Sequence, residues 1–452
     1  MQSDPYQISS DTIKEPPTRL VDRLKFLGPG FILSASVVGS GELIATTILG
    51  AKAGYAAFWI IILSCLIKVA VQLQFGKHAI LSGETTLRAF DKIPGFRIRK
   101  GSWAVWAVLF MTFLKIIQLG GMVGSAALVM NMLFHGGNLL IWAIVIAFSA
   151  SLLIYKDYYP VVEKGSLFMI VSFTLLTLGS LALLSRTSFA FTLADVWDGM
   201  SIHLTRDQII VAIGAFGITG VASDEIIAYN YWCIEKGYAA YTGPKNPDHE
   251  DPARNARAQG WIKVMLLDAV VAMIIYTSVT AAFYLLGAAI LHQSGVVPEG
   301  NSLIEKIALI YTTSLGPGVK VVYLIGAFFV LYSSVFAALA AWTRLYSDGF
   351  GILGWIDFKD LIQRKKMVAI LSFAFPALWI IMYLSINLPV LMILSGGMVG
   401  SVLLILVAYA AIHFKYQRKL EPVNGRIYNL FFWVSLLSIL FVSIYGLYSL
   451  FQ

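Results

Sequence analysis

Apolar stretches long enough to cross a lipid bilayer recur along almost the whole sequence. A helix needs roughly 20 mostly apolar residues to span the hydrocarbon core, and by this measure we expect eleven spans. They fall near residues 27–51, 56–76, 103–133, 138–155, 161–184, 208–233, 260–291, 319–346, 367–386, 388–413 and 428–451. The sequence therefore predicts an all-α polytopic membrane protein.

Lysine and arginine residues are distributed unevenly over the segments that connect these stretches. If the N-terminus faces the cytoplasm, 26 of the 33 basic residues lie in inward-facing segments and only five in outward-facing ones. Cytoplasmic loops of membrane proteins carry such an excess. We therefore expect a cytoplasmic N-terminus, an external C-terminus and insertion in the inner membrane of a bacterium-like cell. The lipid bilayer is then the expected partner, and the sequence leaves the oligomeric state open.

The composition agrees with this class and argues against others. Hydrophobic residues make up 58% of the chain and charged residues 13%, which is too apolar for a soluble globular protein. The net charge of +8 follows from charge sorting across a bilayer, so we expect no nucleic-acid partner. With two isolated cysteines, no phosphate-binding loop and no HExxH motif, we expect neither enzymatic activity nor a resident cofactor.

One octapeptide occurs twice. Val38–Ala45 (VGSGELIA) returns as Val221–Ala228 (VASDEIIA), and the copies lie in spans one and six. Because this offset of five spans is odd, the second copy crosses the membrane in the opposite sense, which is typical of inverted-repeat transporters. We therefore predict a LeuT-like fold of two inverted five-helix repeats plus an eleventh span, with helices 1 and 6 broken. The expected divisions are an N-terminal tail (1–25), a first repeat (26–184), an outward loop (185–207), a second repeat (208–413) and a connector with the last span (414–452).

Both copies place small residues and acids at membrane depth. Broken helices expose unpaired N–H and C=O groups that can bind a substrate at the midplane. The predicted site comprises Gly39, Ser40, Gly41, Glu42, Ser223, Asp224 and Glu225. An alternative stays open, in which the serines and glutamates only cap half-helices. An acid near the membrane centre costs at least roughly 2.5 kcal/mol, which is more than capping returns.

Further polar residues lie within the predicted spans. Lys68 and Lys115 are the available internal cations. Each can pair with one of the acids, or can stand where a coupling cation would otherwise bind. Gln118 lies about one turn after Lys115 and is expected to line the same cavity. Asp268 is a further candidate for proton relay.

A family resemblance joins these observations. The stretch from Gly28-Pro29-Gly30 through Gly39-Ser40-Gly41-Glu42 to Gly54-Tyr55 resembles the first span of the Nramp (natural resistance-associated macrophage protein) divalent-metal transporters. The eleven-span layout with an inside N-terminus is similar as well, and the resemblance extends over most of the chain.

The resemblance also indicates where the chain departs from the family. The first-span Asp-Pro-Gly-Asn corresponds to Gly39-Ser40-Gly41-Glu42, and the sixth-span Met-Pro-His-Asn to Ala222-Ser223-Asp224-Glu225. The family's backbone-carbonyl alanine falls near Thr219. Only the glycine of the metal-binding motifs is kept, so the resemblance implies the scaffold and these positions without the family's ligands.

Two transport functions remain open, for a divalent cation or for an amino acid or other small organic solute, beside a role as a sensor that binds without transport. Glu42, Asp224 and Glu225 form an oxygen-only set suited to a hard divalent cation such as Mg²⁺ or Mn²⁺, whose transport is expected to be coupled to protons. Alternatively, Gly39-Ser40-Gly41 resembles the break of LeuT-like amino-acid transporters. There half-helix N–H groups hold a substrate carboxylate, and the acids would hold its ammonium.

Overall fold

The computed structural model describes residues 4–39, 41–245, 251–297, 305–306, 308, 312, 320–416 and 425–450. Apart from a hairpin of β1 (Arg97–Ile98) and β2 (Gly101–Ser102), the regular structure in these residues is helical. Ten described helices are long and apolar enough to cross a membrane, and α8 is apolar but shorter. The predicted all-α polytopic membrane fold is confirmed.

The spans follow one another in the predicted order. They comprise α2 (Pro29–Val37) with α3 (Thr47–Ala53), α4 (Phe58–Ser82), α6 (Trp103–Leu114) with α7 (Ile116–Leu133), α8 (Leu139–Ile154), α9 (Tyr159–Leu184), α11 (Arg206–Ile218) with α12 (Ser223–Glu235), α13 (Pro252–Leu286), α15 (Lys320–Ile352), α16 (Leu361–Ile386), α17 (Pro389–Tyr416) and α18 (Arg426–Leu450). Short helices outside the spans are α1 (Leu20–Leu24), α5 (Thr86–Phe90), α10 (Leu193–Gly199) and the 3-10 turns Ser10–Thr12 and Ala240–Thr242.

Spans one and six are broken, as predicted. In span one, α2 ends at Val37 and a π-helical turn over Gly41–Thr46 leads into α3. We call the interruption between Val37 and Gly41 the first break. In span six, α11 ends at Ile218 and α12 begins at Ser223. We call residues 219–222 the second break.

Several boundaries differ from the predicted ones. Span three is also interrupted, at Lys115, which ends α6 and begins α7. Span seven begins at Pro252 and continues past Leu286 as a π-helical turn to His292. Asp251 caps its start by accepting from the backbone N–H groups of Ala253 and Arg254. Helices extend beyond the predicted spans because an apolar run measures only the part inside the bilayer, whereas helical hydrogen bonding continues into water.

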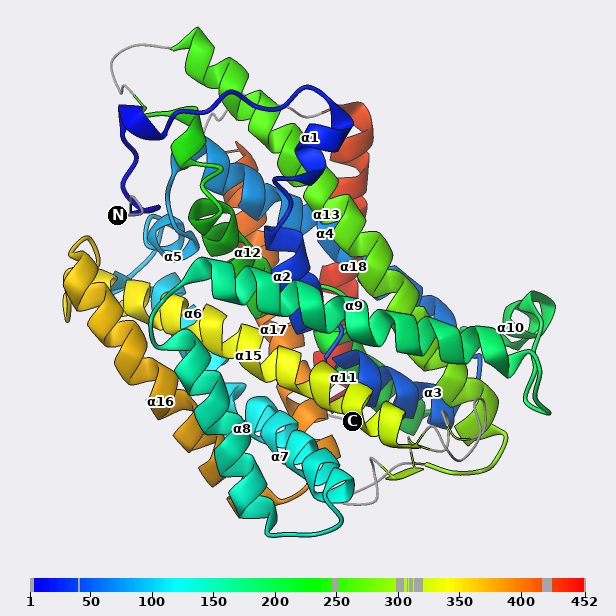
Figure 1. The fold of residues 1–452 in the computed structure, drawn as a ribbon. Helices are drawn as coiled ribbons and strands as arrows, with labels where there is room; N and C mark the ends of the chain where they lie inside the picture. Colours follow the sequence, from blue (N-terminus) through cyan, green and yellow to red (C-terminus); the bar gives the residue numbers. More distant parts are fainter. Residues whose placement is uncertain are drawn as a thin grey trace.

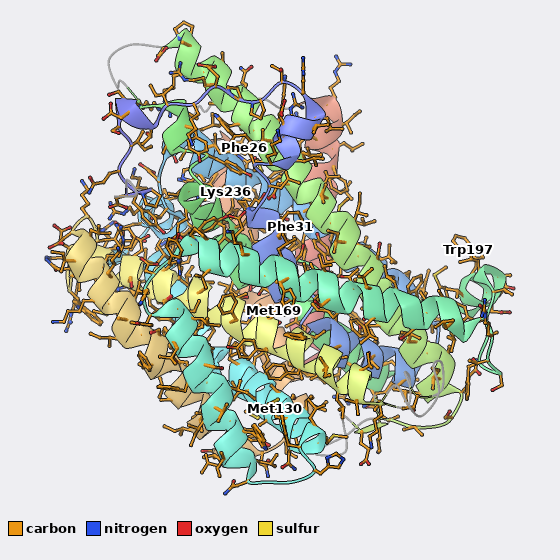
Figure 2. All side chains as sticks on the ribbon, in the orientation of Figure 1. Phe26, Phe31, Met130, Met169, Trp197 and Lys236 are labelled. Atoms are coloured by element: carbon orange, nitrogen blue, oxygen red, sulfur yellow. The ribbon has the colours of Figure 1, made fainter. Side chains whose placement is uncertain are left out.

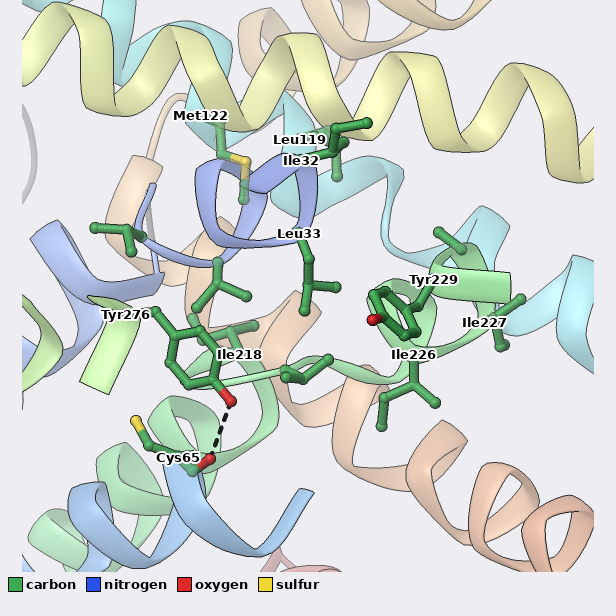
Figure 3. Close-up of a cluster of buried hydrophobic side chains, with 14 of the residues drawn as sticks. Ile32, Leu33, Cys65, Leu119, Met122, Ile218, Ile226, Ile227, Tyr229 and Tyr276 are labelled. Carbon is green, nitrogen blue, oxygen red and sulfur yellow. Dashed lines mark hydrogen bonds between the residues drawn. The ribbon is translucent and has the colours of Figure 1, made fainter. Parts of the chain in front are cut away.

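The two broken spans lie inside the bundle. In Figure 1, α9 and α15 run next to each other across the front, and α2 packs behind them. Further packing joins α11 to α17, α7 to α15 and α17, and α13 to α4. Figure 3 shows apolar side chains around the breaks, with Leu33 of α2 near Ile218 of α11, and Tyr276 donating to the carbonyl of Cys65 at 3.2 Å.

The outer surface of the bundle is apolar. Large hydrophobic side chains are exposed on the outer helices, among them Phe168, Leu175, Ile274 and Phe441. In a soluble protein so many exposed apolar groups would cause aggregation, whereas here they meet lipid tails.

Segments predicted to be cytoplasmic gather on one face of the molecule. Arg364 at the start of α16 forms an ion pair with Asp4 of the tail at 2.7 Å, and Lys236 after α12 pairs with Glu163 of α9 at 2.7 Å. Figure 2 places Phe26 and Lys236 near this face and Trp197 on the projecting α10 well away from it. The contacts agree with the predicted sidedness of the segments relative to one another.

Candidate binding site at the two helix breaks

Two small cavities lie beside the breaks. The first has a volume of about 20 Å³ and is lined by Ser36, Gly41, Lys115, Gln118, Met122, Ile218, Ala222, Asp224, Glu225 and Ser334, among others. The second, also of about 20 Å³, shares Ser36, Asp224 and Glu225 and reaches Trp232 and Ala341. Since a water molecule needs roughly 10–15 Å³ by this measure, each cavity accommodates one water or one small ion.

Asp224 forms an ion pair with Lys115 at the edge of the first cavity. The Lys115 ammonium donates to Asp224 Oδ1, and the two side chains are 2% and 14% exposed. Lys115 stands at the interruption of span three. The predicted pairing of Lys115 with an acid is confirmed, as is the position of Gln118 in the same cavity.

Glu225 caps its own helix and also lines both cavities. Its Oε2 accepts from the backbone N–H of Ala222 at 2.7 Å, so the capping predicted for this glutamate is present. The prediction that Ser223 is the N-cap is wrong: Ala222 holds that position, and the Ser223 hydroxyl has no hydrogen-bond partner among the described residues. The helix begins one residue earlier than a serine cap requires.

Glu42 has different surroundings. It is fully buried and lines neither cavity. Its Oε1 accepts from the Gly220 N–H at 3.1 Å and from the Thr280 hydroxyl at 3.2 Å. In the described part of the chain, no group of three His, Cys, Asp or Glu side chains is arranged to hold a metal ion. The structure thus brings Asp224 and Glu225 to one cavity and keeps Glu42 outside it.

The other predicted residues of the first copy have separate positions. Gly41 lines the first cavity, whereas Gly39 packs against α15, where an added Cβ would lie 1.3 Å from Ser334 Oγ. Ser40 lies outside the described residues.

Lys68 does not pair with an acid, in contrast to the prediction for it. Its buried ammonium donates to the carbonyl oxygens of Phe216 and, at 2.8 Å, Thr219. These carbonyls belong to the C-terminal end of α11, where the helix dipole favours a cation. Thr219, the position given by the family resemblance, therefore already has a cationic partner.

Asp268 belongs to α13, and its carboxylate contacts the start of span one rather than the breaks. Its carboxylate accepts from the backbone N–H groups of Gly28 at 2.8 Å and Gly30 at 2.6 Å, and from the Tyr229 hydroxyl at 3.2 Å. These bonds join the N-terminal end of α2 to α13 and α12. The geometry gives Asp268 a capping role, and proton relay through it remains a prediction.

A charged cluster separates the second cavity from the face that carries the tail. Arg344 lies 5.1 Å from the Trp232 ring and forms ion pairs with Glu235 at 2.7 Å and Asp157 at 2.9 Å. Tyr6 of the tail donates to Glu235 at 2.7 Å. Beyond this cluster lies a cavity of about 580 Å³ lined by Tyr6, Lys14, Tyr159, Glu163, Lys236 and Arg364, among others.

Sequence reasoning did not single out this cluster. Arg344 and Asp157 look like ordinary inward-facing charges at span ends, and nothing in their spacing links them to Glu235. The available signal was Arg344 itself, which follows more than 20 mostly apolar residues of the eighth stretch. A charge so close to an apolar run needs a partner.

A helical bundle whose first and sixth spans are broken, with a small polar cavity between the two breaks, is the architecture of LeuT-like secondary transporters. Solved structures agree. The Eremococcus coleocola manganese transporter is similar with a TM-score of 0.63 at 12% identity, over 98% of this chain and 90% of that one. MhsT in complex with L-phenylalanine is similar with a TM-score of 0.56 at 15% identity, over 96% of this chain and 100% of that one.

Sequence comparison then gives the family. The family model described as natural resistance-associated macrophage protein-like (Nramp) matches residues 30–449, and the chain belongs to this family. Among curated relatives, the uncharacterized protein PM0681 of Pasteurella multocida is 24% identical over 79% of this chain and 77% of its own length. The divalent metal cation transporter MntH of Verminephrobacter eiseniae is 22% identical over 78% of this chain and 74% of its own length. The family predicted from the first-span motif is confirmed.

Proposed function

We propose that this protein is a secondary transporter that moves a hard divalent cation, such as Mg²⁺ or Mn²⁺, across the membrane by alternating access. One observation carries the proposal: Asp224 and Glu225 face a cavity with room for a single small ion, between the two breaks of an Nramp-family fold. Carboxylate and carbonyl oxygens, with water, are the ligands that such cations prefer. The names of the MntH relative and of the manganese transporter support the substrate class.

The surroundings of the carboxylates suggest how the ion would be held. Ser36 and Gln118 also line the first cavity, and both supply oxygens. Mg²⁺ keeps several waters when protein binds it through one or two carboxylates. The Lys115 ammonium contacts Asp224 Oδ1, so an ion that binds this oxygen would displace it, and Lys115 would act as a resident cation in the empty transporter.

Coupling to protons is the second part of the proposal. A divalent ion brings two positive charges to a cavity that already contains two carboxylates and one ammonium. Because charge is costly at membrane depth, we expect ionisable groups of the cavity to exchange protons as the ion enters and leaves, which would couple ion movement to the proton gradient. We further propose that the protein acts in the cell membrane with its N-terminus in the cytoplasm, as the distribution of basic residues predicts.

Transport of an amino acid is the second candidate, and one observation favours it. An ammonium and two carboxylates in one cavity complement the opposite charges of a zwitterion. The volume of about 20 Å³ argues against it, because an amino acid is several times larger than a water molecule. The cation therefore remains the better proposal.

Proteoliposomes that contain the purified protein would test the proposal. We expect saturable uptake of Mg²⁺ or Mn²⁺ that an inward proton gradient stimulates and small amino acids do not inhibit. Asp224→Asn and Glu225→Gln should each lower uptake at least about tenfold, because each loss of a charged ligand costs more than about 1.4 kcal/mol. Asp198→Asn, at an exposed carboxylate on α10, is the matched control and should leave uptake unchanged. Uptake that amino acids inhibit, or full activity of both site variants, would overturn the proposal.

A further inference from the structure

At the two ends of the peptide unit between Thr219 and Gly220 lie two buried side chains that ionise with opposite sign, Lys68 and Glu42. The Thr219 carbonyl accepts from the Lys68 ammonium at 2.8 Å. The N–H of the same peptide unit, on Gly220, donates to Glu42 Oε1 at 3.1 Å. The positive end of the peptide dipole thus meets the carboxylate and its negative end meets the ammonium.

Neither charge has another direct counterion among the described residues. Both side chains are fully buried, and the remaining bonds of Lys68 and Glu42 go to the Phe216 carbonyl and the Thr280 hydroxyl. A buried charge without an opposite charge costs several kcal/mol. The Thr219–Gly220 peptide is the shortest hydrogen-bonded path between them, so each charge compensates the other through it.

The backbone at this peptide has few alternatives. Gly220 has a φ of +60°, and a Cβ there would lie 2.8 Å from the Cα of Cys65 on α4. Ser64, one turn before Lys68 on α4, donates to the same Thr219 carbonyl at 3.0 Å. Span two therefore holds the carbonyl side of the second break, and Glu42 of span one holds its N–H side.

We propose that Glu42 and Lys68 are positioning residues, a charge pair that acts through the Thr219–Gly220 peptide and sets the geometry of the second break. Val221 to Glu225 follow directly after this peptide, so the pair fixes where Asp224 and Glu225 enter the cavity. Glu42 then serves the site without binding the ion. The inference rests on the proposed function only where ion uptake is the readout, since the break is present whatever solute is carried.

A double-mutant cycle on the full-length purified protein tests this pair. Glu42→Gln and Lys68→Met each leave one buried charge uncompensated. We expect each to lower the melting temperature, and to lower the maximal uptake rate at least about tenfold. The double variant Glu42→Gln/Lys68→Met removes both charges. We expect its maximal uptake rate to be at least about tenfold higher than the two single losses combined would give, since replacement of both partners is often tolerated.

A matched control uses another buried carboxylate that accepts backbone N–H groups. Asp268 accepts from Gly28 and Gly30 and has no contact with the Thr219–Gly220 peptide. Asp268→Asn combined with Lys68→Met should give additive losses without recovery. Lys68→Arg, which keeps the charge, should retain more activity than Lys68→Met. If the Glu42→Gln and Lys68→Met single variants fail to express, recovery of expression in the double variant also shows that the two residues compensate each other.

The apparent KM for the ion separates positioning from binding. In Glu42→Gln we expect KM within about threefold of the parent protein, whereas Asp224→Asn should raise it. Additive effects in the Glu42/Lys68 cycle would overturn the inference, as would a rise in KM with unchanged stability in Glu42→Gln. Because the melting temperatures need no substrate, recovery in the cycle would stand even if the carried solute is not a divalent cation.

Discussion

The two copies of the octapeptide have similar sequences and equivalent places in the fold, yet their acids have different surroundings. Glu42 of the first copy turns toward the second break and contacts neither cavity. Glu225 of the second copy caps its own helix and lines both cavities. The inverted repeat reproduces the broken backbone, whereas the role of each side chain depends on what the neighbouring spans supply.

The lysines near the two copies differ in the same way. Lys115 comes from span three and contacts Asp224 directly, beside the cavity. Lys68 comes from span two and reaches Glu42 only through a peptide unit, outside the cavity. One acid therefore lies beside a cavity with an ammonium as its partner, and the other is enclosed by protein.

The largest expected effects come from the glycines of the breaks. At Gly220 an added Cβ meets backbone atoms of span two, 2.8 Å from Cys65 Cα, and the φ of +60° is unfavourable for alanine. At Gly39 the nearest atoms are those of the Ser334 side chain, which a second substitution can remove, and the Val330 carbonyl oxygen follows at 3.1 Å. We expect Gly220→Ala and Gly39→Ala both to abolish uptake and lower the melting temperature by several degrees. Ser334→Gly should restore most activity to Gly39→Ala.

No side-chain substitution on span two should restore Gly220→Ala, because the obstructing atoms are backbone. Ser334→Gly alone is measured beside the rescue, because Ser334 lines the first cavity and donates to the Ser36 carbonyl, and its own effect sets the level to which Gly39→Ala can recover. An active Gly220→Ala variant would mean that the second break tolerates other backbone geometries. The contrast between a side-chain contact at the first break and a backbone contact at the second would then be wrong.

Much of this arrangement could be predicted from sequence, for physical reasons that particular elements show. Each span carries its own apolar signal, and the repeat with its odd offset indicated broken spans one and six. The interruption at Lys115 was missed because a lysine within an apolar stretch does not specify whether the helix continues around it. Pairing of Lys115 with an acid followed from the cost of an isolated charge.

Side-chain directions at the breaks could not be predicted. The sequence contains three acids in two short segments, and only the packed structure separates Glu42 from Asp224 and Glu225. The direction of the Glu42 side chain depends on Gly220 and Thr280, which lie far from it along the chain. The Lys68 contacts with carbonyl oxygens were missed for a similar reason, since backbone acceptors are present everywhere in a sequence and become available only where a helix ends.

An intermediate effect is expected when the lysines are compared. Lys115→Met removes a positive charge beside Asp224, and we expect the apparent KM for the divalent ion to fall by about tenfold, because a like charge within about 4 Å opposes cation binding. Lys68→Met should not lower KM, since its ammonium is outside the cavity. Initial uptake rates over a range of ion concentrations give both values. A rise in KM for Lys115→Met would indicate that this lysine holds the carried solute, as an amino-acid carboxylate would require.

The smallest effects should come from the far ends of the half-helices that follow the two breaks. α3 is followed by Gly54, whose carbonyl accepts from the Tyr284 hydroxyl at 2.7 Å, and this hydroxyl accepts from the Ala57 N–H at 3.1 Å. α12 ends at Glu235, which accepts from Tyr6 at 2.7 Å. Burial and then the Glu235 carboxylate raise the pKa of the Tyr6 phenol, so Tyr6 remains a donor at neutral pH.

Phenylalanine at these two positions distinguishes a fixed half-helix from one that rearranges. Tyr284→Phe leaves two backbone groups without their partner and should cost about 1–3 kcal/mol of stability, with uptake per folded molecule unchanged. Tyr6→Phe removes one bond from a glutamate that Arg344 still neutralises, so stability should change by less than about 1 kcal/mol. If α12 must separate from the tail during transport, Tyr6→Phe will alter the uptake rate by about twofold. Melting temperatures and initial uptake rates are measured on both variants. Equal changes in Tyr284→Phe and Tyr6→Phe would imply that the half-helices after the two breaks are equally fixed.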